Sequence, residues 1–247
     1  MTNRHLLIQL SVTKEKMKNT LKLILATASV ALLAACGGGG GGGTPASQAS
    51  TRTFDVSTAL RAITVSGQNS NFSISSSNGC TGTGSFTASG ATTSTTFEGR
   101  PALSATSMLN INYTNCSPAT ISSTTTNYVD TNYVPLGASS DKYLVYTGTF
   151  NAPSTARVGD VGIISNLSRY TNSSKTTQDG TGQLSYVVEA DTADSALITV
   201  VTKSYTMSNA LELTQLTKYR INSSNQFTLV SITIQYANGV NIVMTRT

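Results

Sequence analysis

Apolar and polar residues alternate one by one along much of this chain, and this constrains its fold more than any other feature. In the clearest stretch the order is Val230, Ser231, Ile232, Thr233, Ile234, Gln235 and Tyr236. Successive side chains of a β-strand point to opposite faces, so the pattern predicts a strand with one buried and one wet face. Similar alternation occurs over residues 109–114 and 184–189. One-sided burial is typical of antiparallel sheets, and we therefore predict an all-β protein.

The C-terminal half is the more regular part of the chain. Between residues 158 and 247 we predict six strands, near 160–170, 181–190, 195–206, 210–221, 227–237 and 240–246. Their short connectors indicate an antiparallel up-and-down meander. Asn238-Gly239 is the strongest hairpin signal, because both positions of the expected turn require positive φ. Strands of about ten residues are long for a sandwich and suit a strongly twisted sheet or a barrel wall, so we expect a twisted sheet, a sandwich, a half-barrel or a barrel.

The first half is less regular. Asp55 or Ser57 would cap one or two helical turns that end near Ala62, the one short helix that we predict. Strands follow near residues 70–76, 81–88, 93–98, 105–114, 119–128 and 142–150. A polar, proline-containing segment places a candidate subdomain break near residues 151–156. Because all-β chains of about 200 residues commonly form one domain, we predict a single domain over residues 52–247.

The N-terminal segment has the layout of an export signal. Lys18 and Lys22 lie in a short basic region, and residues 23–33 form an apolar run that ends in small side chains. The run is shorter than the about 20 apolar residues that span a bilayer, which favours a cleaved signal over a transmembrane anchor. Leu33-Ala34-Ala35-Cys36 follows and resembles the lipobox of bacterial lipoproteins. Met17 would serve as a normal start.

The lipobox resemblance implies a signal peptide over residues 1–35 and a mature chain that begins with a lipidated Cys36. Several acyl chains on one residue suffice for stable membrane anchoring. Gram-negative lipoproteins with Asp after this Cys tend to stay in the inner membrane, whereas Gly37 follows here. The resemblance therefore implies the outer membrane, facing the periplasm or the surface. The rest of segment 36–51 is glycine-rich and polar, and we expect a flexible tether.

Cys80 and Cys116 are the two cysteines that remain in the exported chain. An even pair in an oxidising compartment predicts a disulfide between them. The alternative is a thiol or zinc site, which is disfavoured because the mature chain has no His to complete the ligand set.

The mature chain lacks the residues that most catalytic mechanisms need. Its single histidine, His5, precedes the predicted cleavage site, which excludes His-dependent triads and general bases. A Ser-x-x-Lys pattern ends at Lys142, but it lies in a polar turn and not on a helix face. Glu189, Asp191 and Asp194 lack the rhythm of a calcium loop. We predict no enzyme, no metal and no cofactor; the alternative is an envelope hydrolase that uses Lys142 or these acids.

The net charge does not indicate a nucleic-acid partner. The chain has 16 Lys and Arg against 11 Asp and Glu, but five of the basic residues precede Cys36, with only Glu15 against them. The processed chain is nearly neutral, and its basic residues are scattered singly. The electrostatic footprint of a phosphate-backbone binder is therefore missing.

Tyr128 and Tyr133 are the residues that we single out for partner binding. They lie in a polar stretch before Pro135, and exposed tyrosines provide large contact area at a low entropic cost. The alternative is that one or both pack over the end of the sheet.

These features predict a lipid-anchored outer-membrane lipoprotein whose non-catalytic β domain serves envelope structure or surface interaction. The layout of lipobox, glycine run, two-cysteine region and meander resembles uncharacterised exported lipoproteins of proteobacteria, a resemblance that implies no particular activity. The alternative is a periplasmic carrier that holds a hydrophobic ligand in a barrel-like cavity. Across these two hypotheses, the expected partner is an envelope protein, a glycan or an apolar ligand.

Overall fold

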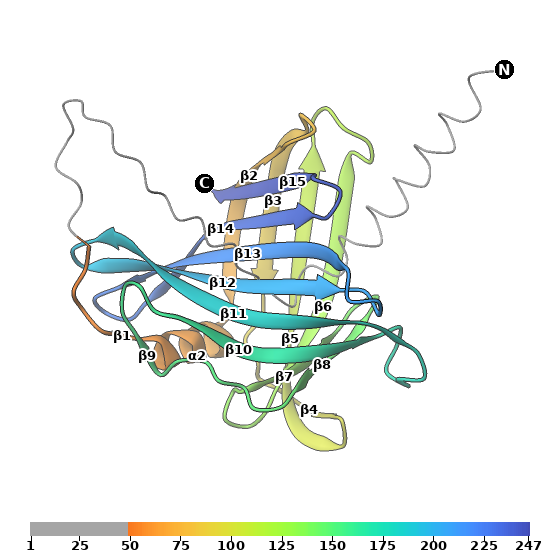
Figure 1. Cartoon of the computed structure of the whole chain (residues 1–247), viewed down its shortest axis with the longest axis horizontal. Coiled ribbons are helices and arrows are strands. Elements are labelled where there is room, and N and C mark those ends of the chain that lie inside the picture. Colours follow the sequence, from red (N-terminus) through yellow and green to blue (C-terminus); the bar gives the residue numbers. More distant parts are fainter. Residues whose placement is uncertain (1–48) are drawn as a thin grey trace.

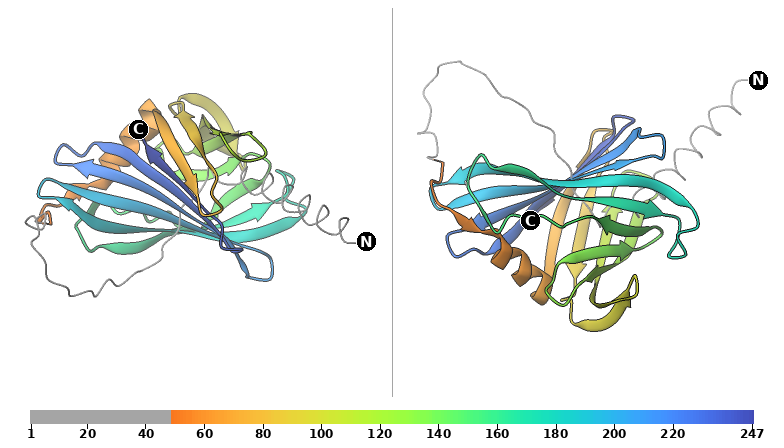
Figure 2. Two further views of the ribbon diagram at one scale, coloured as in Figure 1. Left: turned by 90° about the horizontal axis from the view of Figure 1, so that it is seen from above. Right: turned by 60° about the horizontal axis from the view of Figure 1, so that its bottom comes forward.

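The computed structural model describes residues 49–247 (Figures 1 and 2), so the predicted signal peptide and Cys36 lie outside the described range. The elements are β1 (Phe54–Asp55), α2 (Val56–Ser66), β2 (Gln68–Ser76), β3 (Thr81–Ala88), β4 (Thr93–Phe97), β5 (Arg100–Tyr113), β6 (Thr120–Val129), β7 (Pro135–Ser139), β8 (Tyr143–Thr147), β9 (Thr155–Ala156), β10 (Val161–Tyr170), β11 (Gln178–Thr192), β12 (Ser195–Tyr205), β13 (Leu211–Asn222), β14 (Phe227–Tyr236) and β15 (Asn241–Arg246). Within this range no helix has the length and apolar character needed to cross a membrane.

Twelve strands pair edge to edge in a closed antiparallel barrel. From β2 the ring runs through β15, β14, β13, β12, β11, β10, β8, β7, β6 and β5 to β3, which pairs with β2. β4 folds back on the first part of β5, and β1 pairs with β9 outside the ring. The predicted all-β meander is confirmed, and of the shapes left open it takes the closed one.

The barrel is flattened, so its two walls pack against each other across an apolar core. Figure 1 shows β10 to β13 crossing in front of the more upright β2, β3, β5 and β6. The core contains side chains from both walls, namely Phe72, Ile74, Leu109, Ile111, Leu213, Leu229, Ile232, Ile234, Ile242 and Met244. The outward positions of β2 and β3 are mostly exposed hydroxyl or amide residues, which explains the alternation seen in the sequence.

The two ends of the barrel differ in what covers them. We call the end near α2 the helix end, and the end with the β5–β6 loop the disulfide end. Cys80 and Cys116 form the predicted disulfide, with Cα atoms 5.6 Å apart. The bridge ties the β2–β3 turn to the β5–β6 loop. The ring also continues through the β8–β10 pair, across the candidate break at residues 151–156.

The hairpin at Asn238-Gly239 joins neighbouring strands as predicted, but its turn type differs from the prediction. Only Gly239 has positive φ, at 86°, and the Tyr236 N–H donates to the Val240 carbonyl at 2.9 Å. This is a type I turn followed by one left-handed residue, the common three-residue hairpin loop. The β12–β13 and β13–β14 turns repeat this hydrogen-bond pattern, with Asn209 and Asn225 at the left-handed position.

The other differences from the predicted elements lie in the first half of the chain. The helix continues to Ser66, beyond the predicted end near Ala62, and Asp55 is its N-cap. Residues 135–139 form β7, which the sequence did not indicate. The strand predicted over 142–150 ends at Thr147, because the chain then leaves the ring to form β9.

Candidate functional site

The described part of the barrel contains a cavity of about 240 Å³ at its helix end. Much of its wall comes from alternate positions of neighbouring strands, where the side chains face into the ring. The apolar part of the wall is formed by Phe86, Ala88, Ala105 and Val129. Ile63 and Thr64 of α2 also line it, together with the β3–β4 loop. The cavity therefore lies between the helix end of the barrel and α2, and it is partly open to solvent.

Neutral polar groups line the remaining wall of the cavity. The Asn127 amide donates to the Ser107 hydroxyl at 2.9 Å, and the Gln68 amide donates to the Tyr219 hydroxyl at 3.5 Å. Tyr146 also lines this part of the wall. Burial raises the pKa of the Tyr146 and Tyr219 hydroxyls, so both phenols are neutral at physiological pH.

None of the residues that line the cavity is an acid, a lysine, an arginine or a histidine. In residues 49–247 no group of three or more His, Cys, Asp or Glu side chains could hold a metal ion. The cavity wall therefore provides hydrogen bonds and apolar contact, and it does not provide an acid and base pair for proton transfer.

The helix that covers the cavity is attached through its backbone on one side. The Ala91 N–H donates to the Thr64 carbonyl at 2.8 Å, which ties the last turn of α2 to the β3–β4 loop. A Cβ atom on Gly90 would lie 2.0 Å from the Val65 carbonyl oxygen, so only glycine permits this approach. On its inner side α2 buries Val56 and Ala59. They pack in an apolar cluster with Val188, Ala196, Ile198 and Ile221.

On its other side the helix contacts one of the two tyrosines singled out from the sequence. The Arg61 guanidinium lies over the Tyr133 ring, 5.1 Å from its centroid. Tyr133 occupies the left-handed position of the β6–β7 turn with φ of 67°, where two other hairpins have Asn. A bulky side chain is unfavourable in that conformation, so the turn retains strain while it holds the ring against α2. Tyr133 therefore acts as a side support of the cavity roof.

Tyr128 of β6 is among the residues that line the cavity, next to Asn127 in the chain. Its ring stacks on Phe97 of β4 with centroids 4.5 Å apart. Tyr128 and Tyr133 are both half-buried, and each contacts a different neighbour in the same chain. Their predicted role in partner binding stays a prediction.

The charged residues considered for hydrolysis are all in ion pairs. Glu189 pairs with Lys218 at 2.8 Å, Asp191 with Arg220 at 2.6 Å, and Asp194 with Arg52 at 2.8 Å. The three acids thus point to three separate cations instead of converging. Lys142 pairs with Asp179 at 2.9 Å. The Ser-x-x-Lys segment is not helical, since it runs directly into β8.

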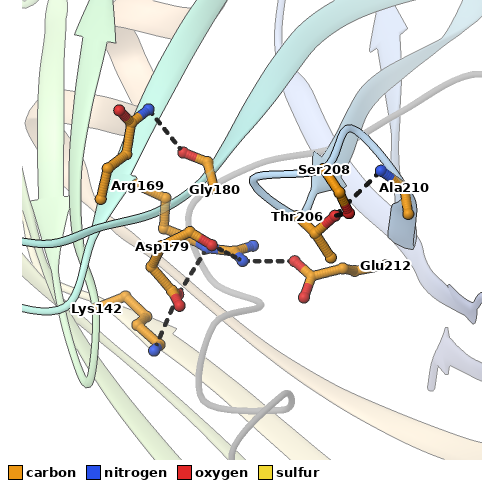
Figure 3. A network of polar contacts seen from close by, with 9 residues as sticks. Lys142, Arg169, Asp179, Gly180, Thr206, Ser208, Ala210 and Glu212 are labelled. Atoms are coloured by element: carbon orange, nitrogen blue, oxygen red, sulfur yellow. Dashed lines mark hydrogen bonds and ion pairs between the residues drawn. The ribbon is translucent and has the colours of Figure 1, made fainter.

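Lys142 belongs to a charged network that joins the start of β8 to β10, β11 and β13 (Figure 3). Arg169 is 3% exposed, and its guanidinium contacts Asp179 at 3.0 Å and Glu212 at 2.5 Å. Burial acts to raise the pKa of Asp179, but the Lys142 hydrogen bond and the two nearby cations outweigh it and lower that pKa. The network is a structural brace of the wall and is separate from the cavity at the helix end.

Of the residues that line the cavity, Tyr128 was singled out from the sequence, whereas the others were missed because their sequence context is polar. Ser107 and Asn127 lie in strands rich in Ser, Thr and Asn, so the sequence does not show which face of the strand is exposed to solvent. A weak signal was present, since Ser107 is two positions from Leu109, whose side chain was predicted to face inward.

Together the fold and the cavity define a closed antiparallel barrel with a neutral site at its helix end, which is compatible with a non-catalytic binder or carrier. No family model matches the chain, and no curated protein matches it. Among solved structures, a DUF1329 family protein from Desulfovibrio piger is similar, with 9% identity, coverage of 78% of this chain and 89% of that one, and a TM-score of 0.30. A likeness of this size carries no argument about function.

Proposed function

We propose that this protein is a lipid-anchored, non-catalytic binder that holds one small neutral molecule in the cavity at the helix end of its barrel. The cavity itself is the observation that carries this proposal. Its walls are apolar and aromatic with a few neutral hydrogen-bonding groups, the usual character of a small-molecule site. This favours the carrier over the envelope or surface-interaction module that the sequence predicts.

The dimensions and chemistry of the cavity limit the ligand. An engineered apolar cavity of about 150 Å³ holds benzene. The cavity described here is larger, at about 240 Å³, and suits a molecule with one or two rings. The ligand is uncharged, because no charged wall group would compensate the loss of its hydration. The paired amides and hydroxyls at Asn127 and Gln68 would bind a polar substituent on the ring.

The direct test is a titration of the full chain with 2-naphthol, a neutral two-ring fluorescent probe. We expect saturable one-to-one binding. Ala105→Phe fills the cavity and should weaken binding by at least about tenfold, which corresponds to about 1.4 kcal/mol. Thr106→Phe is the matched control, because the neighbouring position is exposed on the outer face of β5. Equal binding by both variants would contradict the proposal.

The anchoring part of the proposal has a separate test. The basic region, the apolar run and the lipobox-like Leu33-Ala34-Ala35-Cys36 support it. Intact mass spectrometry of the chain from a Gram-negative host should show acylation that Cys36→Ala abolishes, and the acylated protein should fractionate with the outer membrane. An unmodified wild-type mass would refute anchoring and leave the binding proposal standing.

A further inference from the structure

A second, smaller pocket lies at the disulfide end of the barrel and borders the main apolar core. Its volume is about 120 Å³. The Cys80–Cys116 bridge lines it together with Pro118 of the β5–β6 loop. Ile121, Ile242 and the rings of Tyr113 and Tyr236 form most of the remaining wall. The pocket is separate from the cavity under α2, since the two share no lining residue.

One polar atom in this apolar pocket lacks a partner. The Tyr236 hydroxyl oxygen is buried and has no hydrogen bond within residues 49–247. A buried hydroxyl that loses its bonds to water without replacement is costly, so such groups are uncommon. Burial, and then the neighbouring Tyr113, raise the pKa of Tyr236, so the hydroxyl keeps its proton and remains a donor.

The pocket offers a water molecule few other partners. A buried water typically needs two to four polar neighbours. The Ser76 hydroxyl already donates to the Asn241 carbonyl at 2.8 Å, and the Asn78 side-chain oxygen accepts from the Cys80 N–H at 3.4 Å. Ser117 also lines the pocket and is exposed to solvent, and Tyr113 brings a second phenol hydroxyl to the wall. The rest of the wall is mostly apolar, so a compact guest with one acceptor for the Tyr236 hydroxyl matches it.

We propose that this pocket binds a compact apolar molecule with a single hydrogen-bond acceptor, such as a six-membered cyclic ketone, whose oxygen accepts the Tyr236 hydroxyl proton in a hydrogen bond. At about 120 Å³ the pocket is slightly smaller than the benzene-binding cavity of about 150 Å³, so the guest is a single ring, part of which lies at the open side of the pocket. This inference does not depend on the ligand of the helix-end cavity.

The test uses fluorine NMR on the full chain in lipid nanodiscs, with 4,4-difluorocyclohexanone as the probe and 1,1-difluorocyclohexane as its match without an acceptor. Empty nanodiscs measure the partition of each probe into lipid. The wild type should bind the ketone about fivefold more tightly than the difluorocyclohexane, the gain expected for one hydrogen bond. Tyr236→Phe keeps the ring and should remove this preference, whereas binding of the difluorocyclohexane should remain.

Two further variants locate the site. Ile121→Phe fills the pocket and should abolish saturable binding of both probes. Ala105→Phe changes only the helix-end cavity and should leave the ketone preference unchanged. An unchanged ketone preference in Tyr236→Phe would overturn the proposal. The proposal would also fail if Ala105→Phe lost the ketone preference while Ile121→Phe kept it, because the site would then be the helix-end cavity. Absence of saturable binding to the wild type would show that the hydroxyl is only hydrated. Circular dichroism confirms that each variant is folded.

Discussion

Loss of the Cys80–Cys116 bridge should destabilise the barrel by about 4 kcal/mol. The two cysteines are 36 residues apart in the sequence, and the bridge closes that loop in the unfolded chain. The chain-entropy relation gives about 13 cal/mol/K for a loop of this length, which is about 4 kcal/mol at 25 °C. Because a domain is typically stable by about 5–15 kcal/mol, the unbridged protein should remain folded with a much smaller margin.

Equilibrium urea unfolding of the Cys80→Ala, Cys116→Ala double variant measures this loss. Alanine is preferred over serine because Cys80 is only 7% exposed, and a buried hydroxyl would add its own cost. With a slope of about 2 kcal/mol/M, the midpoint should fall by about 2 M. Wild-type protein reduced with a thiol is the control and should show the same shift. A shift below about 0.5 M in both samples would refute the loop-closure reasoning.

Four further outcomes are expected. Arg169→Met should lower the free energy of unfolding by about 3–5 kcal/mol, because Glu212 loses its ion-pair partner and Asp179 keeps only Lys142. Arg169→Lys should recover part of the loss. Tyr133→Asn should leave the free energy of unfolding within about 0.5 kcal/mol of the wild-type value, since relief of turn strain offsets the lost cation–π contact. Tyr133→Ala should lower it by about 0.5–1 kcal/mol. Gly90→Ala should displace the roof, seen as faster amide exchange in the last turn of α2 at nearly unchanged circular dichroism. Stability should fall as the pH drops through the lowered pKa values of Asp179 and Asp191, because each carboxylate stabilises the fold only while ionised; a flat urea midpoint between pH 6 and pH 3 would contradict this.

The strands of this fold could be predicted because their local signal is strong. One-by-one alternation and short connectors indicated all six C-terminal strands to within a few residues. The closure of the ring could not be predicted in the same way. It depends on β2 pairing with β15, whose partners Phe72 and Arg246 lie at opposite ends of the described chain. A pairing of that kind leaves no local pattern.

The site was less accessible than the fold for a related reason. Ser107 and Asn127 face inward only because the ring closes and sets which face is inside. β7 was missed because Pro135 and Gly137 read as a turn, although Gly137 lies in a strand where a side chain would collide with Phe97. The left-handed conformation of Tyr133 also departs from residue preferences, which favour Asn or Gly there.

The measurement that tests the central claim most directly is mass spectrometry of the full chain isolated gently from cells that produce it. Native and denaturing spectra of the same sample are compared, so that any covalent lipid contributes equally to both masses. The account predicts that the native mass exceeds the denatured mass by one small neutral molecule, and that Ala105→Phe lacks this excess while Thr106→Phe keeps it. Equal native and denatured masses for the wild type, or the same excess on Ala105→Phe, would contradict a ligand in the helix-end cavity.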